Sequence, residues 1–374
     1  MCGIFGLVNK NNAPVSPETT AGASRLLAHR GPDGQGTLHD GPLALAHRRL
    51  AIFDLSDKGR QPMDYRHYAV VFNGAIYNFP ELREELRRHG YEFHTNTDTE
   101  VIPAAYDCWG PGCLHRFNGM WAFALYDRRQ RRLFCARDRF GIRPFYYLDD
   151  GQCFAFASEV KAFGAIPGYR FRLNAIRAYE FLARGWQAHT EECMAEGIRQ
   201  LPAGCWADYQ LDGHRLEIRR YYHLEEHVRQ PEEQTFEDRK RRFRELLADS
   251  VRLRLRADAP LALSLSGGLD SSSVLAVQAA LQPGAPLDCF SVVFPGTAAD
   301  ESPYVDAVAR QCRPTLRKLT PAFESILDGL EQACWFQDEP IASAAVIAHF
   351  RMVQAIRGQG FKVMLNGQGA DEIL

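Results

Sequence analysis

The sequence predicts two domains of different class: a sheet-rich α+β domain, followed by an α/β domain built on a parallel sheet. The first observation is length, because 374 residues correspond to about two domains of roughly 100–200 residues each. The second is that short apolar runs separated by polar turns fill the first half, which is typical of antiparallel strands. The third is that strand-like and helix-like runs alternate in the second half, which favours parallel strands joined by crossovers.

Candidate strands of the first half are often aromatic or β-branched, and their close spacing indicates pairing through tight turns. Two helices interrupt them: Pro80–His89, which has proline in its first turn, and Glu100–Trp109. The expected strands are Pro42–Phe53, Tyr68–Phe72, Met120–Tyr126, Arg132–Ala136, Pro144–Leu148 and Cys153–Ala157.

The sequence changes character after about Gly204. Glu225–Gln234 is charged, contains a proline and lacks an apolar period, so we interpret it as part of a linker. Phe236–Arg256 then places apolar residues at helical spacing. Beyond it we expect strands at Pro260–Leu265, Asp288–Phe294 and Lys362–Leu365, and helices at Ser271–Leu281, Ser302–Gln311, Phe323–Gln337 and Ala344–Arg357. The predicted division is a first domain at 1–210, a linker at 211–235 and a second domain at 236–374.

Composition excludes several classes of protein. The chain has 44 Lys plus Arg against 46 Asp plus Glu, which gives no compositional case for a nucleic-acid binder. No apolar run approaches the roughly 20 residues that span a bilayer, and the start lacks the features of a signal peptide. The ten cysteines show no zinc-binding spacing. We therefore expect a cytoplasmic protein with reduced thiols and with neither nucleic-acid nor membrane partners.

Cys2 differs from the other cysteines because removal of Met1 would place a thiol and a free α-amine on one residue. An α-amine has a pKa near 7.7–8.0, so it can act as the general base for its own nucleophile. Gly3 and Gly6 follow closely and leave room for a substrate against the backbone. Cys2 is therefore a candidate catalytic nucleophile.

Four other residues could complete a pocket around such a thiol. Asn73 and Gly74 end a strand and could face a tetrahedral oxyanion with a side-chain amide and a backbone N–H. Arg49 could bind a carboxylate, and Asp98 could hold an ammonium group. Taken singly, each is also compatible with a surface charge, cap or turn. Together with Cys2 they describe a pocket for an amino acid with a side-chain amide, such as glutamine.

Ser266–Ser272, with the sequence SGGLDSS, lies between a predicted strand and a predicted helix. Backbone N–H groups exposed beside the glycines, the serine hydroxyls and a helix N-terminus together make an anion site. A turn that only caps the helix would have a similar sequence. The segment lacks the lysine of the phosphate loop of kinases and GTPases. Asp270 beside phosphate oxygens, with Asp371 from the last loop, suggests ligands for Mg²⁺.

Two sets of motifs now stand in order along the chain. The first comprises MCGIFG, HRGPDG (29–34), HRRLAI (47–52), FNGAIYN (72–78), RDRFGIRPFYY (137–147) and FASEVKA (156–162). The second comprises LSLSGGLDSS (263–272), DESPY (300–304), DEP (338–340) and GQGADE (367–372). The first set resembles the glutaminase domain, a class II glutamine amidotransferase, of glutamine-hydrolysing asparagine synthetases. The second resembles the ATP-pyrophosphatase synthetase domain of the same family.

This resemblance implies an N-terminal-nucleophile hydrolase sandwich with αββα layers, followed by an α/β nucleotide-binding domain of the PP-loop type. It implies that Cys2 forms a glutamyl thioester and releases ammonia, and that ATP activates a carboxylate, aspartate by default, as acyl-AMP. Ammonia then gives the amide, which for aspartate is asparagine. Mg²⁺ is the implied cofactor. Glutamine, ATP and the carboxylate acceptor are the implied partners, with a homodimer as a candidate assembly.

The resemblance also assigns site residues. The implied glutamine-binding positions are Arg49, Leu50, Ala51, Ile52, Phe53, Asn73, Gly74, Ala75 and Asp98. The implied ATP or pyrophosphate positions are Ser264, Ser266, Gly267, Gly268, Asp270, Ser271, Ser272, Val292, Asn366 and Gly367. Gln368 falls on a position tied to acyl-adenylate formation, and the implied metal ligands are Asp270 and Asp371.

The sequence departs from the family at two of these positions. Ala75 stands where a glutamate usually helps to hold the glutamine amine, and Gln368 stands where many members have glutamate. Three alternatives therefore stay open: the same chemistry on another carboxylate, such as a sugar acid or natural-product precursor; a degenerate, non-catalytic homologue; and a nucleotide-binding regulator. Because the sequence stops at Leu374, just past a loop that should open a helix, we also expect a C-terminal truncation.

Overall fold

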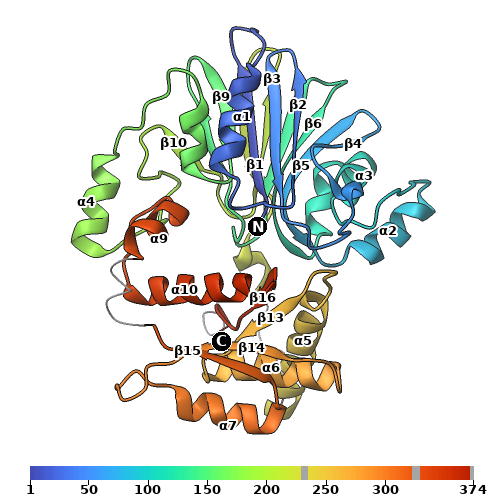
Figure 1. Cartoon of the computed structure of the whole chain (residues 1–374). Coiled ribbons are helices and arrows are strands. Elements are labelled where there is room, and N and C mark those ends of the chain that lie inside the picture. Colours follow the sequence, from blue (N-terminus) through green and yellow to red (C-terminus); the bar gives the residue numbers. More distant parts are fainter. Residues whose placement is uncertain (229–234, 322–328, 371–374) are drawn as a thin grey trace. The chain divides into compact units, whose positions relative to one another are not determined.

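The computed structural model describes residues 1–228, 235–321 and 329–370 (Figure 1). The chain divides into two compact units, Met1–Arg229 and Gln230–Leu374, and each is described by itself. Within the described ranges, no helix combines the length and apolar character needed to cross a membrane.

The first unit contains two antiparallel six-stranded sheets. One, called here the β1 sheet, has the order β10 (Ile198–Gln200), β8 (Tyr146–Asp149), β9 (Cys153–Ala157), β1 (Gly3–Asn9), β3 (Leu43–Arg49), β2 (Gly34–Asp40). The other, the β5 sheet, has the order β12 (Arg215–Arg220), β11 (Cys205–Gln210), β7 (Arg132–Arg137), β6 (Gly119–Asp127), β5 (Tyr68–Ile76), β4 (Met63–Tyr65).

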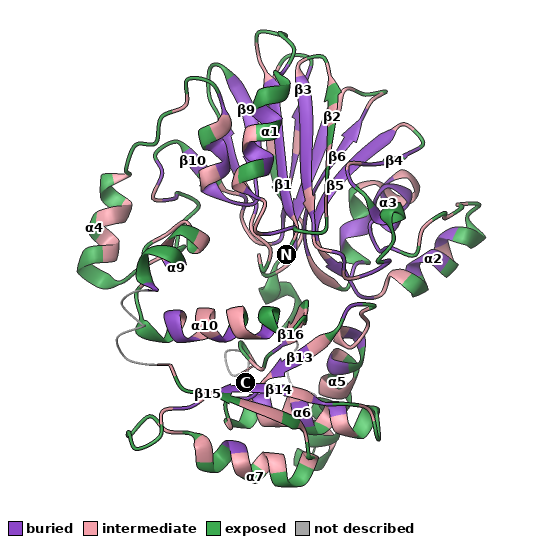
Figure 2. Cartoon of the chain, in the orientation of Figure 1, coloured by how far each residue is buried: buried purple, intermediate pink, exposed green. Residues whose placement is uncertain are grey.

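The two sheets face each other across a shared apolar core. Side chains of β1 and β3, including Ile4 and Leu45, form one cluster with Val71 of β5 and Leu133 of β7. Figure 2 shows the central strands of both sheets as mostly buried. The sandwich explains why many strands read as unbroken apolar runs, because both faces of each central strand are covered.

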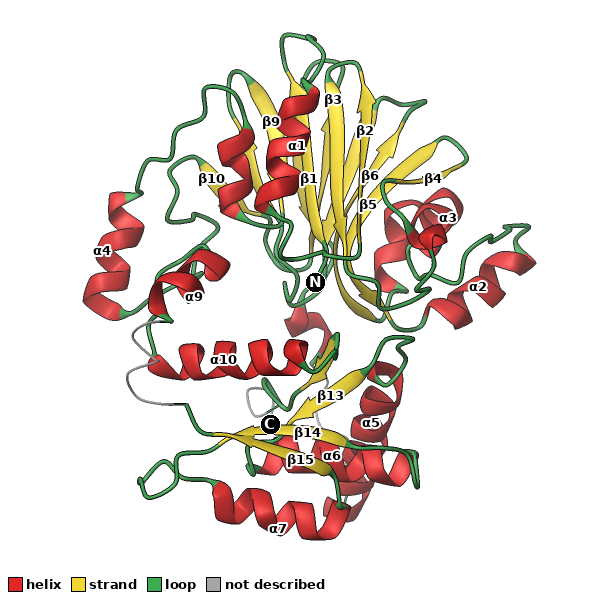
Figure 3. Ribbon diagram, in the orientation of Figure 1, coloured by secondary structure: helices red, strands yellow, loops and turns green. Residues whose placement is uncertain are grey.

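Helices cover the outer faces, as Figure 3 shows. Helix α1 (Pro17–Leu26) and the 3₁₀ helix η3 (Val160–Ala165) pack on the β1 sheet through a second cluster that includes Phe163. Helices α2 (Phe79–Arg88) and α3 (Val101–Trp109) pack on the β5 sheet, with 3₁₀ helix η2 (Gly110–His115). The layers are therefore αββα, as the resemblance implied.

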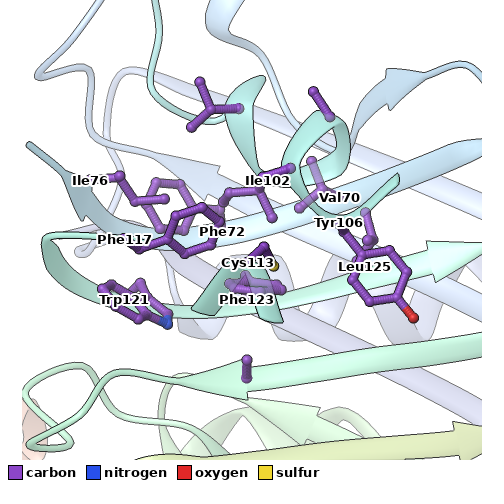
Figure 4. Packing of buried hydrophobic residues seen from close by; sticks show 14 of the residues in the cluster. Val70, Phe72, Ile76, Ile102, Tyr106, Cys113, Phe117, Trp121, Phe123 and Leu125 are labelled. Carbon is purple, nitrogen blue, oxygen red and sulfur yellow. The ribbon is translucent and has the colours of Figure 1, made fainter. Parts of the chain in front are cut away.

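The cluster under α3 is rich in aromatic rings (Figure 4). Trp121 is fully buried and meets Phe117 edge-on, with ring centroids 5.5 Å apart. The labelled side chains of Figure 4 come from β5, β6, α3, η2 and the turn after η2. Burial of such rings supplies a large share of the hydrophobic stabilisation of this layer.

The second unit is a three-layer α/β fold. Its parallel sheet has the order β15 (Thr315–Leu319), β14 (Asp288–Val292), β13 (Leu261–Ser264), β16 (Val363–Leu365). One face packs against α6 (Leu269–Leu281) and α7 (Ser302–Cys312), and α5 (Phe236–Arg254) contacts α6. The other packs against α10 (Ala344–Gly358), which contacts α9 (Leu330–Gln337). The predicted α/β class is confirmed.

The structure adds elements that the sequence reading did not include. These are β1, β2, β4, β10, β11, β12, β15, α1 and α4 (Ala175–Arg184), besides the 3₁₀ helices η1 (Asp57–Gly59), η2, η3 and η4 (Leu224–His227). Strand β3 ends at Arg49, so residues 50–53 leave the sheet rather than continue the expected strand. Strand β12 occupies part of the segment expected as a linker, because its charged sequence RLEIRR forms an edge strand. Residues 229–234, within the expected linker, and 322–328, which include the start of the helix expected at Phe323–Gln337, lie outside the described residues.

Candidate active site

Cys2 lies directly before β1, beside the chain that leaves β3. Its Sγ accepts a hydrogen bond from Leu50 N at 3.4 Å and lies 3.7 Å from Leu50 O. Burial raises the pKa of the Cys2 thiol, so the sulfur needs a base to become a nucleophile. Burial, together with the Arg30 cation, lowers the pKa of the Met1 α-amine to about 5. The Met1 α-amine is thus unprotonated at neutral pH.

A pocket beside Cys2 gathers residues from separate segments of the first unit. Its lining consists of Cys2, Arg49, Leu50, Ile52, Phe53, Gly59, Gln61, Phe72, Gly74, Thr97, Asp98 and Thr99. These come from the start of β1, the loop after β3, strand β5 and the turn before α3. Asp98 is buried, and it is the acid of the pocket that could pair with an ammonium group.

Arg49 is buried and supports the loop that follows β3. Its guanidinium donates to the carbonyls of Ser56 (2.5 Å), Phe53 (3.4 Å) and Asp54. A Cβ on Gly59 would lie 2.1 Å from Arg49 Nη2, so a side chain at position 59 would force the guanidinium to shift. Arginine has more N–H donors than these bonds use, which leaves capacity for a ligand.

Asn73 is fully buried in β5 between the pocket residues Phe72 and Gly74. Among the described residues, neither its Oδ1 nor its Nδ2 has a hydrogen-bond partner. A buried amide without partners costs about 1–3 kcal/mol, so such groups call for an explanation. A ligand that supplies the missing partner is one.

Asp98 is held from two sides. Its Oδ2 accepts from Ile76 N at 2.8 Å, and its Oδ1 accepts from Thr97 Oγ1 at 3.2 Å. Burial raises the pKa of Asp98 to about 6, although both hydrogen bonds act in the opposite direction. Its carboxylate is therefore charged at neutral pH and can attract a cation.

Glu159 is a buried carboxylate with three basic neighbours. Its Oε1 lies 2.7 Å from Arg30 Nη1 and 2.9 Å from His29 Nε2, and its Oε2 lies 2.5 Å from Lys161 Nζ. Burial acts to raise the pKa of Glu159, but these partners outweigh it and bring the pKa to about 2. Arg30 Nε also donates to the Cys2 carbonyl at 2.8 Å. The cluster therefore anchors the backbone of the candidate nucleophile.

A second pocket lies in the other unit, at the carboxyl ends of the neighbouring parallel strands β13 and β16. The chain runs from β13 outward to β14 and β15 and then returns to β16 on the opposite side of β13. Ligands of open α/β sheets bind where the strand order reverses in this way. The lining consists of Ser264, Ser266, Gly268, Leu269, Asp270, Ser271, His349, Asn366, Gly367 and Gln368.

Hydroxyls organise the loop after β13. Ser266 and Ser271 place their Oγ atoms 3.0 Å apart, and Ser266 Oγ accepts from Gly268 N at 3.3 Å. Helix α6 starts at Leu269, so its first N–H groups lie in the pocket wall. Free N–H groups at a helix N-terminus favour a bound anion.

Two glycines allow this loop to contact its neighbours closely. Gly267 has φ +83°, and a Cβ there would lie 2.8 Å from Tyr304 Cβ. A Cβ on Gly367, in the loop after β16, would lie 2.6 Å from Ser271 N. The two loops are therefore in contact through glycine backbone, which a larger residue would force apart.

Comparison with known proteins follows this division. A glutamine amidotransferase domain model matches residues 1–222, and an asparagine synthase model matches residues 242–374. A putative glutamine-hydrolyzing asparagine synthetase 2 of Methanocaldococcus jannaschii is 32% identical over 403 residues, covering 100% of this chain and 75% of its own. The chain belongs to the glutamine-hydrolysing asparagine synthetase family.

Two further relatives of this asparagine synthetase family member carry different names, one an asparagine synthetase and the other an amidase. Glutamine-hydrolyzing asparagine synthetase 3 of Bacillus subtilis is 32% identical over 391 residues, covering 100% of this chain and 62% of its own. Amidase chry2 of Gibberella zeae is 28% identical over 404 residues, covering 100% of this chain and 59% of its own. The chain thus spans about three fifths of the length of these two relatives.

The structure brings most of the positions implied by the asparagine synthetase resemblance into the two pockets. Exceptions in the first unit are Ala51, Asn73 and Ala75, which do not line the pocket. Ala51 N donates to Asp33 Oδ2 at 2.8 Å, and Ala75 is buried in β5. In the second unit, Gly267, Ser272 and Val292 lie outside the lining. Asp371 lies outside the described residues.

Several pocket residues escaped the sequence reading. Gln61, Thr97 and Thr99 line the first pocket, and His349 of α10 lines the second. Burial lowers the pKa of His349, which favours its neutral form. The signal for Thr97 and Thr99 was present, because both flank Asp98 in the sequence. No motif in the sequence marks Gln61 or His349, because each is brought to its pocket by the fold from a segment far away in the sequence.

The donor set of the second pocket suits a magnesium ion carried by a nucleotide. In the described parts of the chain, no group of three or more His, Cys, Asp and Glu could hold a metal ion alone. The pocket offers the Asp270 carboxylate. Mg²⁺ commonly uses one or two protein carboxylates and takes its other oxygens from phosphate and water, which fits this site.

Proposed function

We propose that this protein is a glutamine-dependent amide synthase, which hydrolyses glutamine at Cys2 and transfers the ammonia to a carboxylate activated by ATP. The observation that carries the proposal is one pocket containing the Cys2 thiol and the Asp98 carboxylate, with the unpartnered Asn73 amide beside it in β5. The thiol would attack the side-chain amide of glutamine, the Asp98 carboxylate would bind its α-ammonium group, and the Asn73 amide would donate to the oxygen of the attacked amide.

In the glutaminase half, removal of Met1 would leave the Cys2 α-amine free. This amine takes the thiol proton, and Sγ attacks the side-chain amide carbon of glutamine. The resulting oxyanion is stabilised by Asn73 Nδ2 and Gly74 N. As the C–N bond breaks, the nitrogen takes the proton from the α-amine and leaves as ammonia. Water then hydrolyses the glutamyl thioester to glutamate.

In the synthetase half, an acceptor carboxylate attacks the α-phosphorus of ATP and displaces pyrophosphate. The N–H groups and hydroxyls of Ser266–Ser272 would bind the pyrophosphate oxygens. Asp270, with Asp371 from outside the described residues, would hold Mg²⁺, which neutralises phosphate charge when bound. Ammonia attacks the acyl carbon of the acyl-AMP, and AMP leaves. The product is a carboxamide.

Aspartate is the default acceptor, because two of the relatives cited above are named asparagine synthetases. A second candidate is the same reaction on another carboxylate. It is supported by Gln368, which lines the second pocket without a negative charge, and by a relative named as an amidase.

The test supplies the full chain with amide-¹⁵N glutamine, ATP, Mg²⁺ and aspartate, and follows the label by mass spectrometry. Labelled asparagine is the expected result. Glutamate without asparagine would support the second candidate, and a panel of other carboxylates would then be screened for pyrophosphate release. Absence of glutamate would contradict the role of Cys2.

A further inference from the structure

Gln61 is a buried residue just upstream of β4. Its side chain supplies a hydrogen bond to β5 at a position where the backbone of β4 no longer pairs with it. Strand β4 pairs with β5 through Met63 opposite Val70. Extending this register brings position 61 opposite Phe72. There the Gln61 Oε1, rather than a backbone carbonyl, accepts from Phe72 N at 2.7 Å. The buried N–H of Phe72 thus keeps a partner where backbone pairing has ended.

The other end of the same amide reaches a different segment of the pocket. Gln61 Nε2 donates to Thr99 Oγ1 at 3.1 Å. Thr99 Oγ1 lies 3.2 Å from Thr97 Oγ1, which in turn donates to Asp98 Oδ1 at 3.2 Å. A continuous chain of hydrogen bonds therefore connects the Phe72 amide to the Asp98 carboxylate.

Phe72 is also held through its carbonyl. His47, a buried residue of β3, donates from Nε2 to Phe72 O at 3.1 Å. Burial lowers the pKa of His47 to about 3, so this imidazole is neutral. Both polar groups of the Phe72 backbone are thus bound by side chains, directly before Asn73.

Gln61 itself has little freedom to move. It is 4% exposed, and a Cβ on Gly36 of β2 would lie 2.2 Å from Gln61 O. The backbone that carries the amide therefore presses against the β1 sheet, while the amide binds the β5 sheet and the turn before α3. Because Gln61 is held in place, its amide can fix the distance between the two groups that it binds, Phe72 N and Thr99 Oγ1.

We propose that Gln61 is a positioning residue that sets the distance between Asn73, at the oxyanion end of glutamine, and Asp98, at the ammonium end. The inference rests on the proposed glutaminase activity. Displacement of a reacting group by about 1 Å can cost about 10²-fold in rate. Gln61 therefore affects both ends of the substrate without touching the reacting atoms.

The test compares glutamate release by the wild-type chain with that by Gln61→Met, which keeps side-chain length and removes both hydrogen bonds. We expect kcat/KM for glutamine to fall about 10- to 100-fold, with kcat lowered and KM raised. Thr99→Val keeps the bond to Phe72 N but removes those that the Thr99 hydroxyl makes with Gln61 and Thr97, so it should mainly raise KM. Gln35→Met, on an exposed position of β2, is the matched control and should match wild type.

Alkylation of Cys2 separates positioning from loss of structure. Iodoacetamide reacts with the Cys2 thiolate and does not need the groups at the two ends of glutamine, so its rate of reaction should stay within about twofold of wild type in Gln61→Met. If alkylation and glutamate release fall equally, Gln61 has only a structural role and the inference is wrong. An unchanged kcat and KM in both Gln61→Met and Thr99→Val would also overturn it. If the wild-type chain itself releases no glutamate, the proposed function fails and the inference fails with it.

Discussion

The two pockets of this chain are built in opposite ways. The pocket around Cys2 joins segments from both sheets and from the turn before α3, and it is completed by buried side chains such as Asp98 and Gln61. The pocket around Ser266 is formed mainly by two loops after neighbouring strands, and glycines and hydroxyls dominate it. The first depends on buried side chains from many distant segments, whereas the second depends on one strand–loop–helix unit and the loop after the neighbouring strand.

The largest expected effect tests the chemistry of the first pocket. Cys2→Ala removes the nucleophile, and we expect glutamate release to fall more than about 10³-fold, since residual catalysis by the remaining pocket cannot form a thioester. Glutamate is measured by a coupled assay. Cys334→Ala in α9 is the control and should retain full activity. Glutamate release by Cys2→Ala at the wild-type rate would show that the pocket works without a thiol.

Asn73 tests whether the unpartnered amide serves the transition state. Asn73→Ala should lower kcat for glutamine hydrolysis about 10²- to 10³-fold and change KM little, because an oxyanion donor acts mainly after attack. Steady-state kinetics checks this, with thermal unfolding as a control for folding. A raised KM with unchanged kcat would instead place Asn73 in ground-state binding.

Gly367 tests the contact between the loop after β16 and the start of α6 in the second pocket. In Gly367→Ala the new Cβ would meet Ser271 N at 2.6 Å, so the two loops must separate. We expect ATP affinity to fall about tenfold, which is the equilibrium cost of about 1.4 kcal/mol. Isothermal titration with ATP and Mg²⁺ measures it. Gly358→Ala, where a Cβ meets nothing within 4 Å, is the matched control. Equal affinities in the two variants would contradict loop contact.

The smallest effect expected, between pH 7 and pH 6, is a pH dependence from Asp98. Its pKa is raised to about 6 by burial, so the carboxylate is charged above that pH and neutral below it. kcat/KM for glutamine should therefore be constant above about pH 7 and fall by up to about tenfold per unit below pH 6. Asp98→Asn should be slower and lack this inflection. If its profile keeps the inflection, another group is responsible.

The contrast between the pockets also decides what could be predicted from sequence. The SGGLDSS loop could be predicted as a pocket segment because its chemistry is local, and parallel strands place such loops at one sheet edge. Cys2, Arg49 and Asp98 could be predicted as candidates because each is reactive or charged in a recognisable segment, and all three line the first pocket. Gln61 was missed, since its two partners, Phe72 and Thr99, are 11 and 38 positions away. A neutral amide gives no sign of such contacts.

The fold shows the same limit. Apolar strands in the middle of the sandwich, such as β6 and β7, were predicted because burial on both faces leaves a continuous apolar run. Strand β2 was missed because its sequence, GQGTLHD, is mostly polar and only alternately exposed. Its pairing with β3 depends on the neighbouring strand rather than on its own composition.

Strand β12 was not predicted as a strand because it is highly charged, and these charges also affect how the sheet edge meets other molecules. It ends the β5 sheet, and four of its six residues are charged: Arg215, Glu217, Arg219 and Arg220. An edge strand offers unpaired N–H and C=O groups to any other strand that approaches. Charged side chains along that edge make such intermolecular pairing costly. The charged residues that made β12 resemble a linker in the sequence therefore help to protect the first unit from aggregation through this sheet edge.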